Sequence, residues 1–180
     1  MIKDECLYLK VPGNTSNLGP GFDSIGLAIN RYLHVKIEPS TEWSFHYIDF
    51  DDRFPSGKDN MIYQTIEEIE RKYGKGKDPR PFAVTMTSEL PLERGLGSSA
   101  AAIVAAVEIA DYAMELGLTL EEKVQIATTF EGHADNVAAS LYGGLVIATG
   151  QEGLDTISHK VKDLEMVALI PNHKLKTTDS

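Results

Sequence analysis

The sequence predicts an α+β fold, in which an early mixed or antiparallel sheet is backed by helices. Runs that alternate apolar and polar residues, the pattern of half-buried strands, are concentrated in the first half of the chain, whereas helical spacing dominates later segments. The 180 residues are 42% hydrophobic and 24% charged, which is the composition of a globular protein. At roughly 150 residues per domain, this length indicates one domain, or one and part of another.

The first predicted strands are bounded by proline and glycine. Residues 6–11 alternate as a strand that Pro12-Gly13 ends, and a glycine-rich loop follows from Asn14 to Gly26. Two further alternating runs, 33–37 and 43–47, are separated by a short polar turn. This spacing predicts that they form an antiparallel pair.

The middle of the chain alternates helices with a strand. Asn60 can cap a helix whose isoleucines share one face, and Gly74 ends that helix. A strand is expected at residues 84–87, before a second glycine-rich segment. The helix from about residue 98 to 116 is mostly Ala, Ile and Val in its first half, so we expect burial on most sides, with Gly117 closing it.

The last predicted elements are two helices and two strands. A capping box at residues 119–122 begins a helix that runs to about Glu131. Residues 133–141 form a further helix, and residues 145–149 a strand. The apolar run 166–170 predicts a last buried strand.

Charge and composition limit the partners. Lys and Arg number 17 against 27 Asp and Glu, so the net charge is −10, which repels nucleic acid and anionic membrane surfaces. The charged N-terminus does not have the pattern of a signal peptide, and no run approaches the roughly 18 apolar residues of a membrane helix. The single cysteine, Cys6, cannot form an internal disulfide. These observations predict a cytoplasmic protein without nucleic-acid or membrane partners.

The most informative segment is the glycine–serine run at residues 95–101. Glycines let backbone amides approach phosphate oxygens, and a helix N-terminus carries unpaired N–H groups and partial positive charge. The hydroxyls of Ser98 and Ser99 can add donors to phosphate or a ligand to Mg²⁺. The alternative is a simple turn with an N-cap. Neither a Walker nor a dinucleotide-binding glycine pattern is present.

A polar cluster, Glu131, His133, Asp135 and Asn136, lies in a mainly apolar stretch. A carboxylate can hold Mg²⁺, and His, Asp and Asn can bind a polar substrate or orient a hydroxyl. The alternative is structural, because acidic and amide side chains are favourable at the start of a helix. Zinc is disfavoured because the H-E-x-x-H spacing is absent and no cysteine is near.

In the first glycine-rich loop, Asn17 and Asp23 flank Gly-Pro-Gly-Phe. Asn and Asp stabilise turns by bonding nearby backbone, which is the structural explanation for both residues. Phe22 would then anchor this loop in the core.

Three separated motifs together resemble the homoserine kinases of the GHMP kinase superfamily. They are VPGNTSNLGPGFDSIG at 11–26, PLERGLGSSAA at 91–101 and EGHADNV at 131–137. The Gly-Leu-Gly-Ser-Ser core is common to the superfamily, and the first and third motifs carry the narrower identification. The resemblance spans nearly the whole chain. It implies a GHMP-kinase N-terminal domain with a left-handed βαβ crossover, and phosphorylation of the L-homoserine hydroxyl by ATP in threonine biosynthesis.

The resemblance also implies roles for single residues. The expected ATP-binding residues are Asn60, Pro91, Leu92, Glu93, Arg94, Gly95, Leu96, Gly97, Ser98, Ser99, Ala100 and Ala101. The expected Mg²⁺ ligands are Ser99 and Glu131, and the expected substrate-binding residues are Asn17, Asp23, His133 and Asn136. Catalytic roles fall to Asp135, Asn136 and Glu131, with Asp135 either a general base or an orienting group.

The homoserine kinases continue into a C-terminal domain whose arginines hold the substrate carboxylate. We therefore expect residues 1–180 to be the N-terminal ATP-binding domain, without the C-terminal substrate-closing domain, and inactive or weakly active alone. Two alternatives stay open: another small-molecule GHMP kinase, such as one for mevalonate-type alcohols, and a nonenzymatic nucleotide-binding fragment. A homodimer is also open.

Overall fold

The computed structural model describes residues 6–48, 54–149, 154–162, 164–168 and 170. The elements in chain order are β1 (Leu7–Ser16), β2 (Ile25–Pro39), β3 (Ser44–Tyr47), α1 (Met61–Tyr73), β4 (Phe82–Ser88), α2 (Ser98–Met114), α3 (Leu120–Glu131), α4 (Ala134–Tyr142), β5 (Leu145–Thr149) and β6 (Asp155–His159). The predicted α+β class is confirmed. No helix in the described part of the chain is long and apolar enough to cross a bilayer.

One mixed sheet organises the molecule. Its order is β3-β4-β2-β5-β6, and β1 pairs with β2 off this path. The long strand β2 is antiparallel to β1, β4 and β5, whereas β3 and β4 are parallel. With α1 between them in sequence, β3 and β4 form a βαβ unit, and the left-handed sense expected for the crossover stays a prediction.

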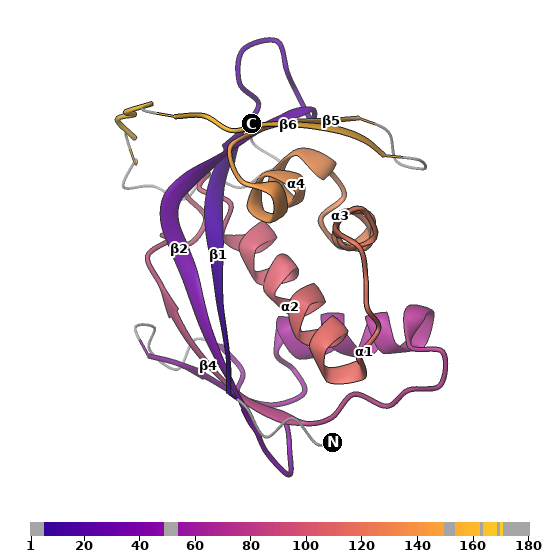
Figure 1. The fold of residues 1–180 in the computed structure, drawn as a ribbon. Coiled ribbons are helices and arrows are strands. Elements are labelled where there is room, and N and C mark those ends of the chain that lie inside the picture. The colour runs from indigo at the N-terminus through magenta and orange to yellow at the C-terminus, as the bar shows by residue number, and fades with distance from the viewer. Residues whose placement is uncertain (1–5, 49–53, 150–153, 163, 169, 171–180) are drawn as a thin grey trace.

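The four helices lie on one side of β1, β2 and β4, and β5 with β6 covers the α4 end (Figure 1). Helix α2 is central: 11 of its 17 residues are buried, and it contacts α1, α3, α4, β1 and β2. Its alanines allow close approach of these neighbours, and each buried side chain removes apolar surface from water. This confirms the expected burial of α2 on most sides.

The predicted caps of α1 and the capping box of α3 are confirmed, whereas the predicted end of α2 is not. The Asn60 side chain accepts a hydrogen bond from the Ile62 amide at the start of α1, and Gly74 caps its end. Thr119 and Glu122 form both bonds of the capping box at the start of α3. Helix α2 ends at Met114, two residues earlier than expected, with Glu115 rather than Gly117 in the left-handed cap position.

Two strand predictions at the N-terminal end are wrong. Pro12-Gly13 does not end β1, because a register shift between Pro12 and Asn14 lets the strand continue to Ser16. The runs 33–37 and 43–47 do not pair, because β4 lies between β2 and β3. Alternation identifies a strand but not its neighbour, so the sequence pattern could not show this insertion.

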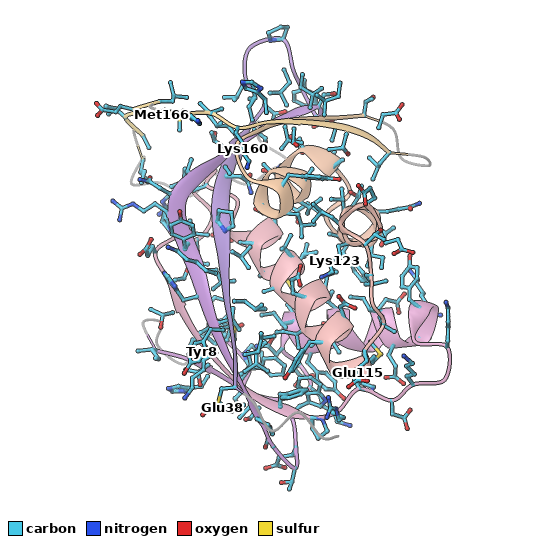
Figure 2. All side chains as sticks on the ribbon, in the orientation of Figure 1. Tyr8, Glu38, Glu115, Lys123, Lys160 and Met166 are labelled. Carbon is cyan, nitrogen blue, oxygen red and sulfur yellow. The ribbon has the colours of Figure 1, made fainter. Side chains whose placement is uncertain are left out.

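The predicted buried strand at 166–170 is also wrong. The described residues there are not in a strand, and Met166, Val167 and Ile170 are 49%, 89% and 47% exposed. Figure 2 labels Met166 near the end of the molecule where β5 and β6 lie. The strand that does form, β6, pairs with β5, and its Ile157 is 68% exposed. Its residues lack the apolar alternation that a sequence reading needs.

Candidate active site

The glycine loop between β4 and α2 supports an open helix N-terminus. Gly97 is the N-cap of α2 with φ +67°, and Gly95 has φ +70°. These left-handed conformations suit glycine, and they turn the chain sharply into the helix. No side chain caps α2, and its first turn has no acidic residue. The amides of that turn and the helix dipole therefore form a setting for an anion.

This loop rests on β1. The Asn14 amide donates a hydrogen bond to the Leu96 carbonyl at 3.2 Å. A Cβ on Gly13 would lie 2.8 Å from that same carbonyl oxygen, and a Cβ on Gly97 would lie 2.2 Å from Asn14 Nδ2. The glycines are therefore required for contact between the loop and the strand as well as for the turn.

Glu131, the last residue of α3, meets the first turn of α2. The Ser99 hydroxyl donates to Glu131 Oε2 at 3.1 Å. Burial raises the pKa of the Glu131 carboxyl, opposed by the Ser99 hydrogen bond and by His133. Gly132 has φ +90°, so the chain turns directly from α3 into α4. Two motifs that are distant in sequence thus share one hydrogen bond.

Asp135 lies in the first turn of α4 and is 1% exposed. Its Oδ1 accepts from the Asn136 amide at 2.8 Å and from Asn136 Nδ2 at 3.1 Å. Its Oδ2 is buried without a hydrogen-bond partner among the described residues. A Cβ on Gly26 would lie 2.2 Å from the Asp135 carbonyl oxygen, so Gly26 of β2 lets the start of α4 pack against the sheet.

The first loop reaches the start of α4. Asp23 Oδ2 lies 3.8 Å from His133 Nε2, and both side chains are about half exposed. The Asp23 amide donates to Asn17 Oδ1 at 2.9 Å, and both residues have left-handed φ angles. Figure 1 shows this loop, between β1 and β2, at the same end of the molecule as α4 and the start of α2. Asn17 and Asp23 therefore stabilise a turn, and Asp23 places that turn close to His133 of the polar cluster.

Phe22 does not anchor this loop, contrary to the sequence prediction. It is 63% exposed at the loop surface. Ile25 occupies the space beneath the turn instead, because a Cβ on Gly21 would lie 2.2 Å from Ile25 atoms. Ile25, the first residue of β2, therefore packs against the turn and is itself only partly buried.

Three residues of the expected ATP site, Asn60, Ala100 and Ala101, have side chains that are buried within the fold. Asn60 is 1% exposed, and its Nδ2 donates to the Pro55 carbonyl and the Tyr47 hydroxyl at 2.7 and 3.1 Å. Both Nδ2 protons are therefore used within the chain, and the adenine contact expected of Asn60 stays a prediction. The Ala100 and Ala101 side chains are fully buried, so only their backbone could face a ligand.

A groove lies beside the loop rather than over Ser99 and Glu131. It has a volume of about 1230 Å³ between β2, the loop and the segment that follows β6. Its lining includes Leu27, Tyr32, Pro91, Leu96 and Met166. Two of the expected ATP-binding residues, Pro91 and Leu96, therefore line the groove, whereas no residue of the polar cluster at 131–136 does.

The donor set near Ser99 fits Mg²⁺ only together with another ligand. Ser99 and Glu131 offer two hard oxygen donors, the type that Mg²⁺ prefers. No group of three or more His, Cys, Asp or Glu side chains suited to a metal occurs among the described residues. The arrangement therefore fits an ion that takes its remaining ligands from phosphate oxygens and water, and not a site formed by protein alone.

Sequence reasoning missed two residues of this region, Asn14 and Ser140. Asn14 Nδ2 donates to Ser140 Oγ at 2.8 Å, and Ser140 Oγ donates to the Pro12 carbonyl at 2.9 Å. Both residues are buried. Asn14 lay inside the first motif, but its position beneath Gly97 depends on the packing of β1 against the loop, which no spacing rule describes.

Comparison with known proteins shows what the chain is similar to. Residues 60–144 match the GHMP kinases N terminal domain. The chain is 44% identical to the homoserine kinase of Bacillus cereus over 97% of its own length and 57% of that relative. It is 46% identical to the homoserine kinase of Halalkalibacterium halodurans, over 94% of this chain and 55% of the relative. The chain thus spans somewhat over half the length of the curated relatives it matches.

Solved structures of homoserine kinases also resemble this chain. A proposed homoserine kinase from Listeria monocytogenes has a TM-score of 0.75 at 37% identity, covering 88% of this chain and 55% of that one. The homoserine kinase from Cytophaga hutchinsonii also has a TM-score of 0.75, at 26% identity, over 99% of this chain and 59% of that one. A mevalonate kinase from Methanococcus jannaschii, with a TM-score of 0.64 and 14% identity over 89% of this chain and 57% of that one, shares the fold alone.

Proposed function

We propose that the chain forms the nucleotide site of an ATP-dependent kinase, a proposal supported by the match of residues 60–144 to the GHMP kinases N terminal domain. In a protein of the relatives' full length, it phosphorylates the hydroxyl of L-homoserine to give O-phospho-L-homoserine. One observation carries the proposal: three motifs far apart in sequence converge. Ser99 of the second motif meets Glu131 of the third, and Asp23 of the first motif lies 3.8 Å from His133 of the third.

The nucleotide phosphates bind at the start of α2. Its uncapped first turn offers amide donors, and the left-handed Gly95 and Gly97 keep the loop free of side chains at the turn. Residues 91–101 form this cradle, with the buried Ala100 and Ala101 contributing backbone only. Nucleotide affinity should therefore depend on loop geometry more than on any single side chain.

Ser99 and Glu131 would hold Mg²⁺ together with ATP, and the ion would supply positive charge to the phosphates. The partly buried Glu131 carboxylate faces Ser99 in position to share such an ion. Burial raises the pKa of the Glu131 carboxyl because it disfavours the charged form. A cation beside this carboxylate would therefore offset the electrostatic cost of its buried negative charge.

Homoserine binds between the first loop and the start of α4. The Asp23 carboxylate attracts its ammonium group, and Asn17, His133 and Asn136 offer polar contacts. During transfer, the homoserine oxygen forms a bond to the γ-phosphorus while the bond from that phosphorus to the bridging oxygen breaks, releasing ADP. The hydroxyl proton passes to Asp135 Oδ2, which is buried and without a partner among the described residues, or to a phosphoryl oxygen if Asp135 only orients the substrate.

The decisive experiment is a coupled ADP-release assay. It uses this chain joined to the C-terminal portion of a homoserine kinase relative, hereafter the extended chain, with ATP and Mg²⁺. Turnover should depend on L-homoserine and be absent with mevalonate, and the product should be O-phospho-L-homoserine by mass spectrometry. Turnover of mevalonate instead would favour the other small-molecule kinase, and ATP binding without turnover of any alcohol would favour the nonenzymatic alternative.

A second measurement separates the two roles of Asp135. In the extended chain, Asp135→Asn keeps the side-chain shape and removes its ability to take a proton. A general base typically contributes about 10²–10⁴-fold, so a loss of that size in kcat supports the base. A smaller loss, with KM for homoserine raised instead, supports the orienting role.

A further inference from the structure

We propose that Asn14 is a positioning residue for the phosphate loop, held in place by Ser140 of α4. The inference rests on the proposed nucleotide site and gives Asn14 and Ser140 a role that the resemblance does not assign to them. Asn14 is 0% exposed near the end of β1 and contacts the loop twice. Its backbone amide bonds the Leu96 carbonyl, and its side chain lies directly beneath Gly97.

The hydrogen bonds of Ser140 determine which way the Asn14 amide faces. The Ser140 hydroxyl donates its proton to the Pro12 carbonyl, which can only accept. It must therefore accept from the Asn14 amide, and Asn14 Nδ2 lies 2.8 Å away. Because Nδ2 is fixed toward α4, the orientation of the whole amide group beneath Gly97 is determined from that helix.

The contact with Gly97 leaves no free space. A Cβ on Gly97 would lie 2.2 Å from Asn14 Nδ2, 2.5 Å from Cγ and 2.7 Å from Oδ1. Gly95 has nearly the same φ, yet nothing lies within 4 Å of its Cβ position. Asn14 thus supports the loop at the one glycine that begins α2, and Gly95 provides a matched comparison.

A purely structural filler would not need an amide here. Asn14 Oδ1 is buried and has no hydrogen-bond partner among the described residues. A buried acceptor without a partner costs free energy that an apolar side chain of similar size would avoid. The cost is explained if the amide is needed to hold the loop, through Ser140, in register with the helix that carries Asp135 and Asn136.

The main test measures ATP and AMP affinity by calorimetry, with Mg²⁺, for Asn14→Ala, Ser140→Ala and the double variant. AMP lacks the phosphates that the loop is proposed to hold. We expect each single change to weaken ATP binding at least about tenfold with little change for AMP, and the double variant to be no weaker than the worse single variant. Equal losses for ATP and AMP, or independent effects of the two changes, would overturn the inference.

Two controls separate this inference from general destabilisation. Ile69→Val removes a methyl group from a fully buried α1 side chain away from the loop, and should lower the melting temperature without changing ATP affinity. Gly97→Ala should destabilise the wild-type background more than the Asn14→Ala background, whereas Gly95→Ala should cost the same in both. Equal penalties for Gly97→Ala in the two backgrounds would mean that Asn14 does not support the loop.

The outcomes distinguish the two proposals. If the wild-type chain and the extended chain both fail to bind ATP, the proposed function fails, and the Asn14 inference with it. If ATP binds and its affinity is unchanged in Asn14→Ala and Ser140→Ala, the proposed function stands and the Asn14 inference is wrong.

Discussion

Lys123 connects α3 to α2 at the end opposite to the Ser99–Glu131 contact. Its Nζ lies 2.8 Å from Glu108 Oε2 and 2.9 Å from Asp111 Oδ2, and Figure 2 labels it between these helices. Asp111 also accepts from the amides of the turn at residues 117–118. Because Glu131 ends the same helix, we expect Lys123 to help set the position of α3 along α2.

The cost of Lys123→Met follows from burial. The Lys123 side chain is 15% exposed, and those of its two partners are 27% and 16% exposed. Breaking a fully buried pair costs about 3–5 kcal/mol and an exposed one under about 1 kcal/mol. Asp111 keeps its two backbone donors and Glu108 can reach water, so we expect about 2 kcal/mol, or about 4–8 °C in melting temperature for a chain of this size.

The pH dependence gives the prediction its sign. Burial alone would lower the pKa of Lys123, but hydrogen bonds to Glu108 and Asp111 raise it above the ordinary value of 10.5. A raised amine pKa stabilises the fold fully below 10.5 and loses that contribution as pH rises through the folded-state value. The difference in melting temperature between wild type and Lys123→Met should therefore be constant from about pH 7 to 9 and shrink above about 10.5.

Scanning calorimetry on both proteins across this range is the assay. Lys36→Met is the matched control, because Lys36 makes an equally short contact with Glu38, at 2.7 Å, but in a pair whose side chains are 37% and 39% exposed. It should leave the melting temperature nearly unchanged. A Lys123→Met protein as stable as wild type at pH 7 would refute the reasoning from burial.

Three further predictions concern the proposed site. Gly97→Val should lose thermal stability as well as ATP affinity, since its Cβ would lie 2.2 Å from Asn14 Nδ2; calorimetry showing a normal fold and normal affinity would contradict this. Glu131→Gln should bind ATP more weakly than wild type with Mg²⁺ but more tightly in EDTA, where it removes repulsion; the same rank order in both buffers would count against a shared ion. In the ADP-release assay, the extended chain should exceed this chain in kcat/KM for homoserine by about 10²-fold or more, because transfer depends on close positioning of the hydroxyl; equal values would contradict the expected need for a second domain.

Local rules predicted much of the fold. The cap at Asn60, the capping box at 119–122 and the buried α2 depend on residues close in sequence, and all were found. Strand neighbours depend on distant packing, so the insertion of β4 between β2 and β3 was missed. The run 166–170 failed for a related reason: apolar residues indicate burial only where a surface is available to cover them, and here Val167 is 89% exposed.

For the site, the sequence indicated which residues gather but not what supports them. Serine and glycine at a helix start, and acidic residues at 131–136, can be recognised from the sequence alone. The contact of Ser99 with Glu131 and the approach of Asp23 to His133 need the fold. Asn14 lay inside the first motif and was expected at the start of a glycine-rich loop, whereas it is fully buried in β1 beneath the second loop.

The charge distribution predicts that metal and nucleotide bind the proposed site together. The net charge is −10, and Asp23, Glu131 and Asp135 add negative charge around the proposed site. Against them stand the N-termini of α2 and α4, neither capped by a side chain, and each equivalent to roughly half a positive charge. Such dipoles orient a phosphate but do not offset three carboxylates and a triphosphate. In the proposed site, a divalent cation held by Glu131 together with the phosphates would close that gap, so Mg²⁺ should raise ATP affinity by the same factor by which ATP raises affinity for Mg²⁺.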